Sequence, residues 1–416
     1  MKSHRVIILL LITIIFLTTF PANSQNYAAS LQTETEFRSH PFTEIWRGEK
    51  KDTMFQSCVL GYAKNVTIFT PNGFSEYAGE KYPVIVTFDR NGVDLTNFLL
   101  HSVDILEMAG QTPRSIVVSI ESGGEPGDRT KEARWSIDGK EANGERYDRF
   151  VFDEPMPHII DKYRGGKNQV IVYGHSWFGY HTAMILKNHM PDLLGVISAS
   201  PCCLKDERID EIVQAVKECS PLKYKFFLRI ASGRDIGDDL EVYRKLKGRI
   251  GMLRLPENFD YKSTWYSAAM HMEVPVLQCI QLMYEIYADW ACLAFTYSDP
   301  YNNPTFDDDQ LYDSLQKMPD EIYWIHIPIS DRHLDWRVEY HRYIKDERVT
   351  LECRLATWKF MVSRFGETPE LYFNIASYYD NLGQSDSSEY YIRKCRSFDL
   401  DDDLKGRIKE LEKEVG

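Results

Sequence analysis

Residues 169–190 read QVIVYGHSWFGYHTAMILKNHM, and this stretch decides the predicted fold. It opens with a short, continuous apolar run, which is typical of a strand buried on both faces. Its second half carries apolar residues at helical spacing. Between the two, GHSWFG places Ser176 on a strand-to-helix turn. Such a turn exposes a serine as a nucleophile when it follows the pattern G-x-S-x-G, and here Phe178 stands in place of the second glycine.

Further apolar runs alternate with helical stretches along the chain. The predicted strands span 66–71, 83–88, 115–120, 169–173, 195–200 and 225–232, and the predicted helices span 95–108, 147–163, 179–190 and 238–250. This alternation is typical of an α/β fold, a mostly parallel sheet with helices on both faces. The long polar segment 121–147 follows a predicted central strand. We expect it near the C-terminal edge of the sheet, where α/β proteins form their sites.

The N-terminus has the pattern of a secretory signal peptide. Two basic residues, Lys2 and Arg5, precede the apolar run 6–20, and small residues stand before a cleavage point after Ser24. The run is shorter than the ~20 residues of a spanning helix, and no cysteine follows the cleavage point to carry a lipid. We therefore expect residues 1–24 to be removed and the protein to be secreted or periplasmic, without a membrane span. An uncleaved anchor is the alternative.

Composition and charge exclude some partners and cofactors. The 416 residues are 43% hydrophobic, and the formal net charge of −13 comes without a basic stripe, so we expect no nucleic-acid partner. Eight cysteines permit disulfides in an exported protein without indicating the pairs. Cys202 and Cys203 are adjacent, a spacing that suits metal ligands poorly, and no HExxH motif occurs. We therefore expect neither a metal nor a cofactor.

The chain divides into an α/β domain and a helical extension. We predict the domain over 25–295, a linker and helical connection over 296–365, and a helical hairpin over 366–416. The hairpin resembles one tetratricopeptide-type unit, with a turn at 381–385. One such unit cannot bury its own apolar face. It therefore either caps the preceding helices or contacts a protein partner, and both alternatives stay open.

A serine nucleophile needs a base within reach, an acid that orients the base, and donors for the oxyanion. On a fold of this kind the three residues follow in the order Ser, acid, His. Asp235 lies in a glycine-bracketed turn after strand 225–232, and Asp238 is the alternative acid. His271 is the first histidine after either acid. We therefore predict a triad of Ser176, Asp235 and His271.

The remaining site residues are predicted from their places next to the serine, after strand 83–88 and among the aromatic residues near the site. The backbone N–H of Trp177 follows the serine and is expected to face the oxyanion. A second N–H is expected from the loop after strand 83–88, at Arg90 or Asn91. Asn91, Phe178 and Trp265 are predicted to contact the substrate.

Several stretches together resemble one known family. They read YPVIVTFD, DRFVFDEPMPHIIDKYR, VIVYGHSWFG, SASP, ASGRD and HMEVP, in this order over about residues 45–295. They resemble the esterase family of the α/β-hydrolase superfamily that includes enterochelin (ferri-siderophore) esterases and relatives of S-formylglutathione hydrolase. The resemblance implies a Ser/acid/His hydrolase and carries these roles onto Ser176, Asp235 and His271. Some secreted members of the family append a tetratricopeptide-like tail.

Besides Cys202, which stands where the family's SPS loop has its last serine, the sequence departs from that family at three places. Phe178 replaces the middle glycine of the elbow, Arg90 replaces a glycine in the oxyanion loop, and Met272–Glu273 follow the histidine where the family has Gly-Ser. Two hypotheses result. The first is a secreted serine ester hydrolase that forms an acyl-enzyme on Ser176 and acts on a small-molecule ester, with siderophore and carbohydrate-linked esters as the expected classes. The alternative is a catalytically lapsed module that keeps the fold and binds a partner.

Overall fold

The computed structural model describes ten parts of the chain: 46–74, 81–88, 95–123, 128–135, 143–219, 222–235, 237–291, 308–329, 334 and 351–415. The chain from Trp46 onward forms one compact unit. The predicted signal peptide and the start of the predicted linker, 296–307, lie outside these residues. Among the helices of the described part, none is both long enough and apolar enough to cross a membrane.

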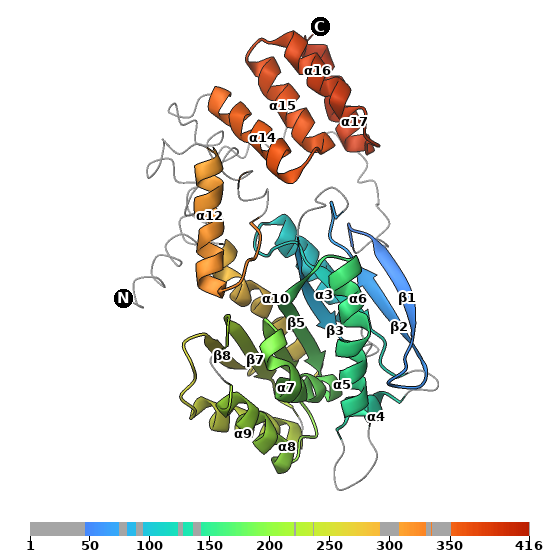
Figure 1. Ribbon diagram of the computed structural model, residues 1–416, viewed down its shortest axis with the longest axis vertical. Coiled ribbons are helices and arrows are strands. Elements are labelled where there is room, and N and C mark those ends of the chain that lie inside the picture. Colours follow the sequence, from blue (N-terminus) through green and yellow to red (C-terminus); the bar gives the residue numbers. More distant parts are fainter. Residues whose placement is uncertain are drawn as a thin grey trace. The chain divides into compact units, whose positions relative to one another are not determined.

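One mixed sheet forms the centre of the α/β domain (Figure 1). Its strand order is β1-β2-β4-β3-β5-β6-β7-β8. The four strands β3, β5, β6 and β7 are buried along most or all of their length, as continuous apolar runs predict. The strand bounds are β1 Lys50–Gln56, β2 Ala63–Phe69, β3 Tyr82–Thr87, β4 Ile116–Ile120, β5 Gly165–His175, β6 Gly195–Ala199, β7 Phe226–Ser232 and β8 Phe259–Trp265.

The direction of the strands determines where a site can form. β1 and β2 pair antiparallel, as do β2 and β4, and all other neighbours are parallel. From β3 the chain continues to β4 on one side, and from β5 it continues to β6 on the other side. The carboxyl ends of β3 and β5 therefore form a topological switch point, the usual place for a ligand in an open α/β sheet.

Helices cover both faces of the sheet, as predicted. On one face α3 packs on α10, and on the other face a connected group runs from α4 to α9 (Figure 1). The bounds are α3 Leu95–Met108, α4 Arg129–Ala133, α5 Gly144–Asp153, α6 Pro155–Lys162, α7 Trp177–His189, α8 Asp206–Lys217, α9 Asp238–Gly251 and α10 Val274–Ile286, with a short 3-10 helix at Met190–Asp192. The predicted helix 147–163 is two helices, because Pro155 lacks the N–H that would continue α5.

The C-terminal part is helical. It contains α12 Asp308–Tyr323, α14 Leu351–Phe365, α15 Pro369–Asn381, α16 Ser385–Cys395 and α17 Asp402–Val415. α15 packs on α14 and on α16. The turn between α15 and α16 contains Gly383 at φ 68°, within the predicted turn 381–385. The likeness to a tetratricopeptide unit stays a prediction.

Candidate active site

Ser176 lies on a strained turn between β5, which ends at His175, and α7, which begins at Trp177. Its backbone angles are φ 60° and ψ −118°, a region that non-glycine residues rarely adopt. The Ser176 N–H donates to Ala199 O at 3.0 Å, so the turn is tied to the end of β6. A sharp, strained strand-to-helix turn is the conformation that exposes a nucleophilic serine at the edge of an α/β sheet.

The elbow GHSWFG needs glycine at two positions, Gly174 and Gly179, because the backbone of neighbouring segments approaches closely there. A Cβ on Gly174 would lie 2.2 Å from Phe178 O, and a Cβ on Gly179 would lie 2.5 Å from Ala199 O, so neither position tolerates a side chain. Position 178 does accommodate a side chain. The Phe178 ring is fully buried and stacks on Phe88, with ring centroids 5.7 Å apart. This burial corrects the expectation that Phe178 contacts the substrate, because its side chain belongs to the core.

The structure brings Asp235 and His271 together, although 36 residues separate them. His271 Nδ1 lies 2.8 Å from Asp235 Oδ1. The hydrogen bond to Asp235 raises the pKa of His271 above its ordinary value, against the opposite effect of burial. This contact leaves Nε2 as the ring nitrogen that is available to another group.

Asp235 is held by several donors. Its Oδ2 accepts hydrogen bonds from Ser200 Oγ at 2.9 Å, from Ser232 Oγ, and from the Gly233 N–H at 3.2 Å. Burial alone would raise the pKa of Asp235. The hydrogen bonds from His271, Ser232, Ser200 and Gly233 outweigh burial and lower the pKa to about 2. The carboxylate is therefore ionised and fixed in orientation at neutral pH.

The Ser176 hydroxyl has a different partner in this structure. Ser176 Oγ donates to Cys202 Sγ at 3.7 Å, and within the described residues no hydrogen bond joins it to His271. The loop that carries His271 is nevertheless fixed beside the elbow, because His175 Nε2 donates to His271 O at 2.9 Å. Hydrogen bonds to a catalytic serine are often absent before substrate binds. A rotation about the Cα–Cβ bond of Ser176 redirects its hydroxyl.

Some predicted residues fall outside the described part of the chain. Arg90 and Asn91 do, as does the side chain of Asp238, so their roles stay predictions. Trp177 is the first residue of α7, and its N–H therefore has no acceptor within the helix. Trp265 is 53% exposed, and its Nε1–H donates to Gly233 O at 3.2 Å, next to the turn that holds Asp235.

Other neighbours of the site were not predicted from the sequence. Ser200, Ser232, His175 and Cys202 make the contacts given above, and the exposed Arg134 lies with its guanidinium carbon 5.6 Å from the centre of the Trp177 ring. The SASP stretch was singled out only for its resemblance to the family. Its position directly after β6, beside the elbow strand, was the available signal for Ser200 and Cys202.

Comparisons with known proteins place the fold. An uncharacterised protein from Capnocytophaga ochracea has a similar structure, with a TM-score of 0.55 and 16% identity over 88% of this chain and 99% of the other. An IroE-like serine hydrolase from Shewanella oneidensis gives a TM-score of 0.56 and 16% identity over 75% of this chain and 100% of the other. No curated protein matches the chain.

At 16% identity the two structures establish the fold alone, which is that of an α/β hydrolase. The likeness to a family comes from the sequence. Residues 57–229 match a family model described as "Putative esterase", and this part includes β5, the elbow and Ser176. This match covers less than half of the chain, and in that part the chain is similar to the esterase family, which supports a carboxylic ester hydrolase.

Proposed function

We propose that the chain is a secreted serine ester hydrolase in which Ser176 is the nucleophile, His271 the general base and Asp235 the orienting acid. The observation that carries the proposal is the pairing of the strained turn at Ser176 with the 2.8 Å contact between His271 Nδ1 and Asp235. A strained serine costs free energy, and a buried carboxylate with four donors is an unusual arrangement. Nucleophilic catalysis uses both features.

The proposed mechanism follows from the groups in place. His271 Nε2 accepts the hydroxyl proton of Ser176 as Oγ attacks the acyl carbon of the ester. The N–H of Trp177 and a second donor from the loop after β3 stabilise the oxyanion. His271 returns the proton to the leaving alcohol, and an acyl-enzyme remains. Water, activated by the same histidine, then releases the acid.

The surroundings of the elbow favour an ester with an aromatic or anionic part. Trp265 is exposed beside the Asp235 turn, and Arg134 lies over the Trp177 ring. An aromatic face and a guanidinium suit a flat ring, a sugar or an acidic group. These features support siderophore esters and carbohydrate-linked acyl esters as substrate classes.

The test combines labelling with turnover. We expect the purified chain to hydrolyse p-nitrophenyl acetate and to react with a fluorophosphonate probe at Ser176. Ser176→Ala should lose labelling and lower kcat by about four orders of magnitude or more. Ser397→Ala, which removes a hydroxyl from an exposed residue in the turn between α16 and α17, is the matched control and should keep both activities.

A panel of acyl-sugar, feruloyl and catecholate esters then identifies the substrate class by the ratio of kcat/KM values. Absence of hydrolysis and of probe labelling in the unsubstituted chain would contradict the proposal. That result would support a lapsed module that binds a partner through the α/β domain or the C-terminal helices.

A further inference from the structure

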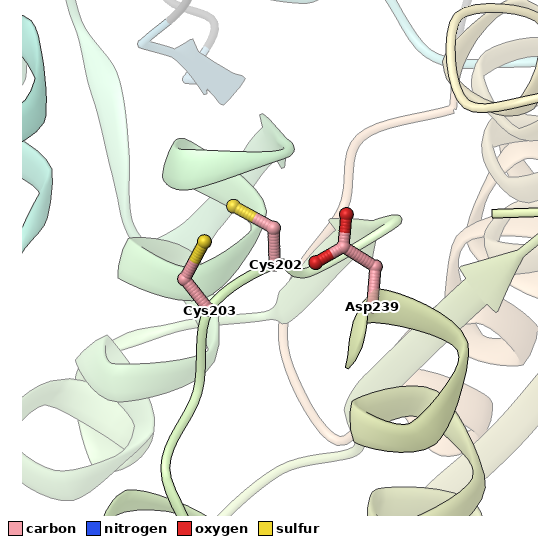
Figure 2. Close-up of side chains that lie close together, drawn as sticks. All are labelled: Cys202, Cys203 and Asp239. Atoms are coloured by element: carbon pink, nitrogen blue, oxygen red, sulfur yellow. The ribbon is translucent and has the colours of Figure 1, made fainter. Parts of the chain in front are cut away.

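Two adjacent cysteines and one carboxylate meet beside the elbow (Figure 2). Cys202 and Cys203 follow β6, and Asp239 lies in the first turn of α9. The two sulfur atoms and a carboxylate oxygen of Asp239 all lie within 4.8 Å of one another. Cys202 is buried, Cys203 is exposed and Asp239 is half-buried, so the cluster is open to solvent on one side.

The backbone at Cys203 is what makes two neighbouring thiols converge. Successive side chains of an extended chain point to opposite sides. Cys203 has φ 62°, in the left-handed region that costs a non-glycine residue about 1 kcal/mol or more. Figure 2 shows both sulfur atoms on the same side of the loop, with the Asp239 side chain reaching toward them from α9. Adjacent cysteines suit metal ligands poorly in an extended chain. The left-handed turn at Cys203 removes this obstacle, because it brings the two thiols together.

The three groups form a donor set for a thiophilic divalent cation. Zn²⁺ binds thiolate sulfur at about 2.3 Å and carboxylate oxygen at about 2.0–2.2 Å in a tetrahedron, whose ligand atoms are then about 3.3–3.8 Å apart. Small rotations bring atoms that already lie within 4.8 Å to such spacings. A thiophilic cation would use all three groups as ligands.

The cluster touches the proposed nucleophile. Cys202 Sγ is the acceptor of the Ser176 hydroxyl at 3.7 Å, close to the edge length of a zinc tetrahedron. Asp239 Oδ2 lies 4.0 Å from His271 Nδ1, so the cluster reaches the base as well. A tetrahedral ion bound to Cys202, Cys203 and Asp239 keeps a fourth position, and the Ser176 hydroxyl is a neighbouring oxygen that already contacts the cluster.

We propose that Cys202, Cys203 and Asp239 form a binding site for Zn²⁺ or a similar thiophilic divalent ion, and that the bound ion takes Ser176 Oγ as its fourth ligand and stops ester hydrolysis. Binding replaces the two thiol protons, which pass to solvent. The metal site stands on the cluster itself, whereas the inhibition rests on the proposed function of Ser176.

The absorption spectrum of bound Co²⁺ tests the metal site without a measurement of ester hydrolysis. We expect the full-length chain, reduced and freed of metal, to bind one equivalent of Co²⁺ with a near-ultraviolet thiolate-to-cobalt charge-transfer band that Zn²⁺ abolishes. Cys203→Ser and Asp239→Asn should each weaken the affinity by at least about tenfold. Cys58→Ser, which removes an exposed thiol between β1 and β2, is the matched control and should keep the band unchanged.

The second readout is inhibition. Zn²⁺ should block p-nitrophenyl acetate hydrolysis and fluorophosphonate labelling in the unsubstituted chain, and Cys203→Ser should resist Zn²⁺ by the same factor by which it loses Co²⁺ affinity. Absence of the band, or an equal band in Cys203→Ser, overturns the metal site. Hydrolysis that is insensitive to a bound ion overturns the inhibition but leaves the proposed function in place. A cobalt band in a chain without any esterase activity supports the metal site while it contradicts the proposed function.

Discussion

His175 is fully buried, and its side chain holds the loop that carries His271. Its Nε2 lies 2.9 Å from His271 O, and the two rings have centroids 4.6 Å apart. Burial lowers the pKa of His175 to about 3, so the ring is neutral and its Nε2–H donates to the carbonyl. We therefore infer that His175 is a positioning residue, which fixes the backbone of the proposed base.

Removal of this donor should affect turnover more than binding. We expect His175→Phe to lower kcat about tenfold, the value of one lost hydrogen bond, with little change in KM. His175→Gln keeps an amide donor and should recover part of kcat. His158→Phe, on α6 where the ring packs on Phe55 and Tyr163, is the control. Equal losses in kcat for the Phe and Gln variants would contradict a positioning role.

The buried carboxylate of Asp235 makes the free energy of unfolding depend on pH at low pH. Its pKa in the folded chain is about 2, below the ordinary 3.8, so the unfolded chain binds the proton more tightly. The stabilisation is complete above about pH 5 and is lost as the pH falls toward 2. We expect the difference in unfolding free energy between the unsubstituted chain and Asp235→Asn to shrink by about 2 kcal/mol over this range. Urea unfolding at several pH values measures it, and a constant difference would contradict the assignment.

At the scale of the helices and strands, the pattern of apolar residues determined which elements could be predicted. β3 to β7 are continuous apolar runs, and the sequence predicts all of them within a few residues. β1 and β8 lie at the two edges of the sheet, where β1 is largely exposed and β8 is mostly half-buried. Their sequences KKDTMFQ and FDYKSTW mix polar with apolar residues and therefore contain no continuous apolar run. α8 and the short α4 were also missed.

The candidate site was predicted from chain order and from the family resemblance, which gave Ser176, His271 and either Asp235 or Asp238. The structure brings His271 and Asp235 into contact, and the catalytic roles stay predictions. The hydrogen-bond partners of these residues depend on backbone angles that cannot be predicted from the sequence pattern. The left-handed turns at Ser200 and Cys203 and the approach of His175 to a carbonyl group are of this kind.

A buried ion pair anchors α4 beneath the site. Lys64 Nζ in β2 lies 2.8 Å from Glu132 Oε1 in α4, and both side chains are almost fully buried. Glu132 also accepts from Tyr62 OH at 2.7 Å and from the Gly123 N–H at 2.7 Å. α4 precedes Arg134, which lies over the Trp177 ring, so this pair fixes one wall of the proposed substrate site.

Removal of one partner of the ion pair Lys64–Glu132 should destabilise the fold. We expect Lys64→Met to lower the free energy of unfolding by about 3–5 kcal/mol, because a buried carboxylate is left without its cation. The double variant Lys64→Met/Glu132→Leu should recover much of the loss. Lys50→Met, from the exposed pair Lys50–Asp52, is the control and should change stability by less than about 1 kcal/mol. Urea unfolding measures all three, and additive losses in the double variant would contradict the ion-pair explanation.

At the scale of the whole molecule, contacts of Tyr323 lead us to infer that the α/β domain extends past its predicted end at residue 295. Tyr323 OH donates to Ile286 O at 2.7 Å, and the Lys225 N–H donates to Tyr323 O at 2.9 Å just before β7. Tyr323, Ile327 and Ile329 have no exposed surface. The segment that follows α12 therefore belongs to the packing of the sheet.

Two truncated chains test this boundary. We expect a chain that ends at residue 295 to lose several kcal/mol of stability, because the apolar surface beneath Tyr323 and Ile327 becomes exposed. A chain that ends at residue 350 keeps this segment and should melt at a higher temperature. Thermal unfolding of both chains measures the difference. Equal melting temperatures would favour the boundary at 295.

The turn at Ser176 also bears on how the chain can evolve. With φ 60°, the position favours glycine, and Ser176→Gly should unfold with a free energy higher than that of Ser176→Ala by about 1 kcal/mol or more. Urea unfolding of the two variants tests this difference. In a lineage released from ester hydrolysis, selection for stability alone would drive codon 176 toward glycine. If Ser176 is the nucleophile that we propose, a serine that is kept at this position indicates continuing selection for catalysis, and the sequences of descendants of the gene can be checked for it.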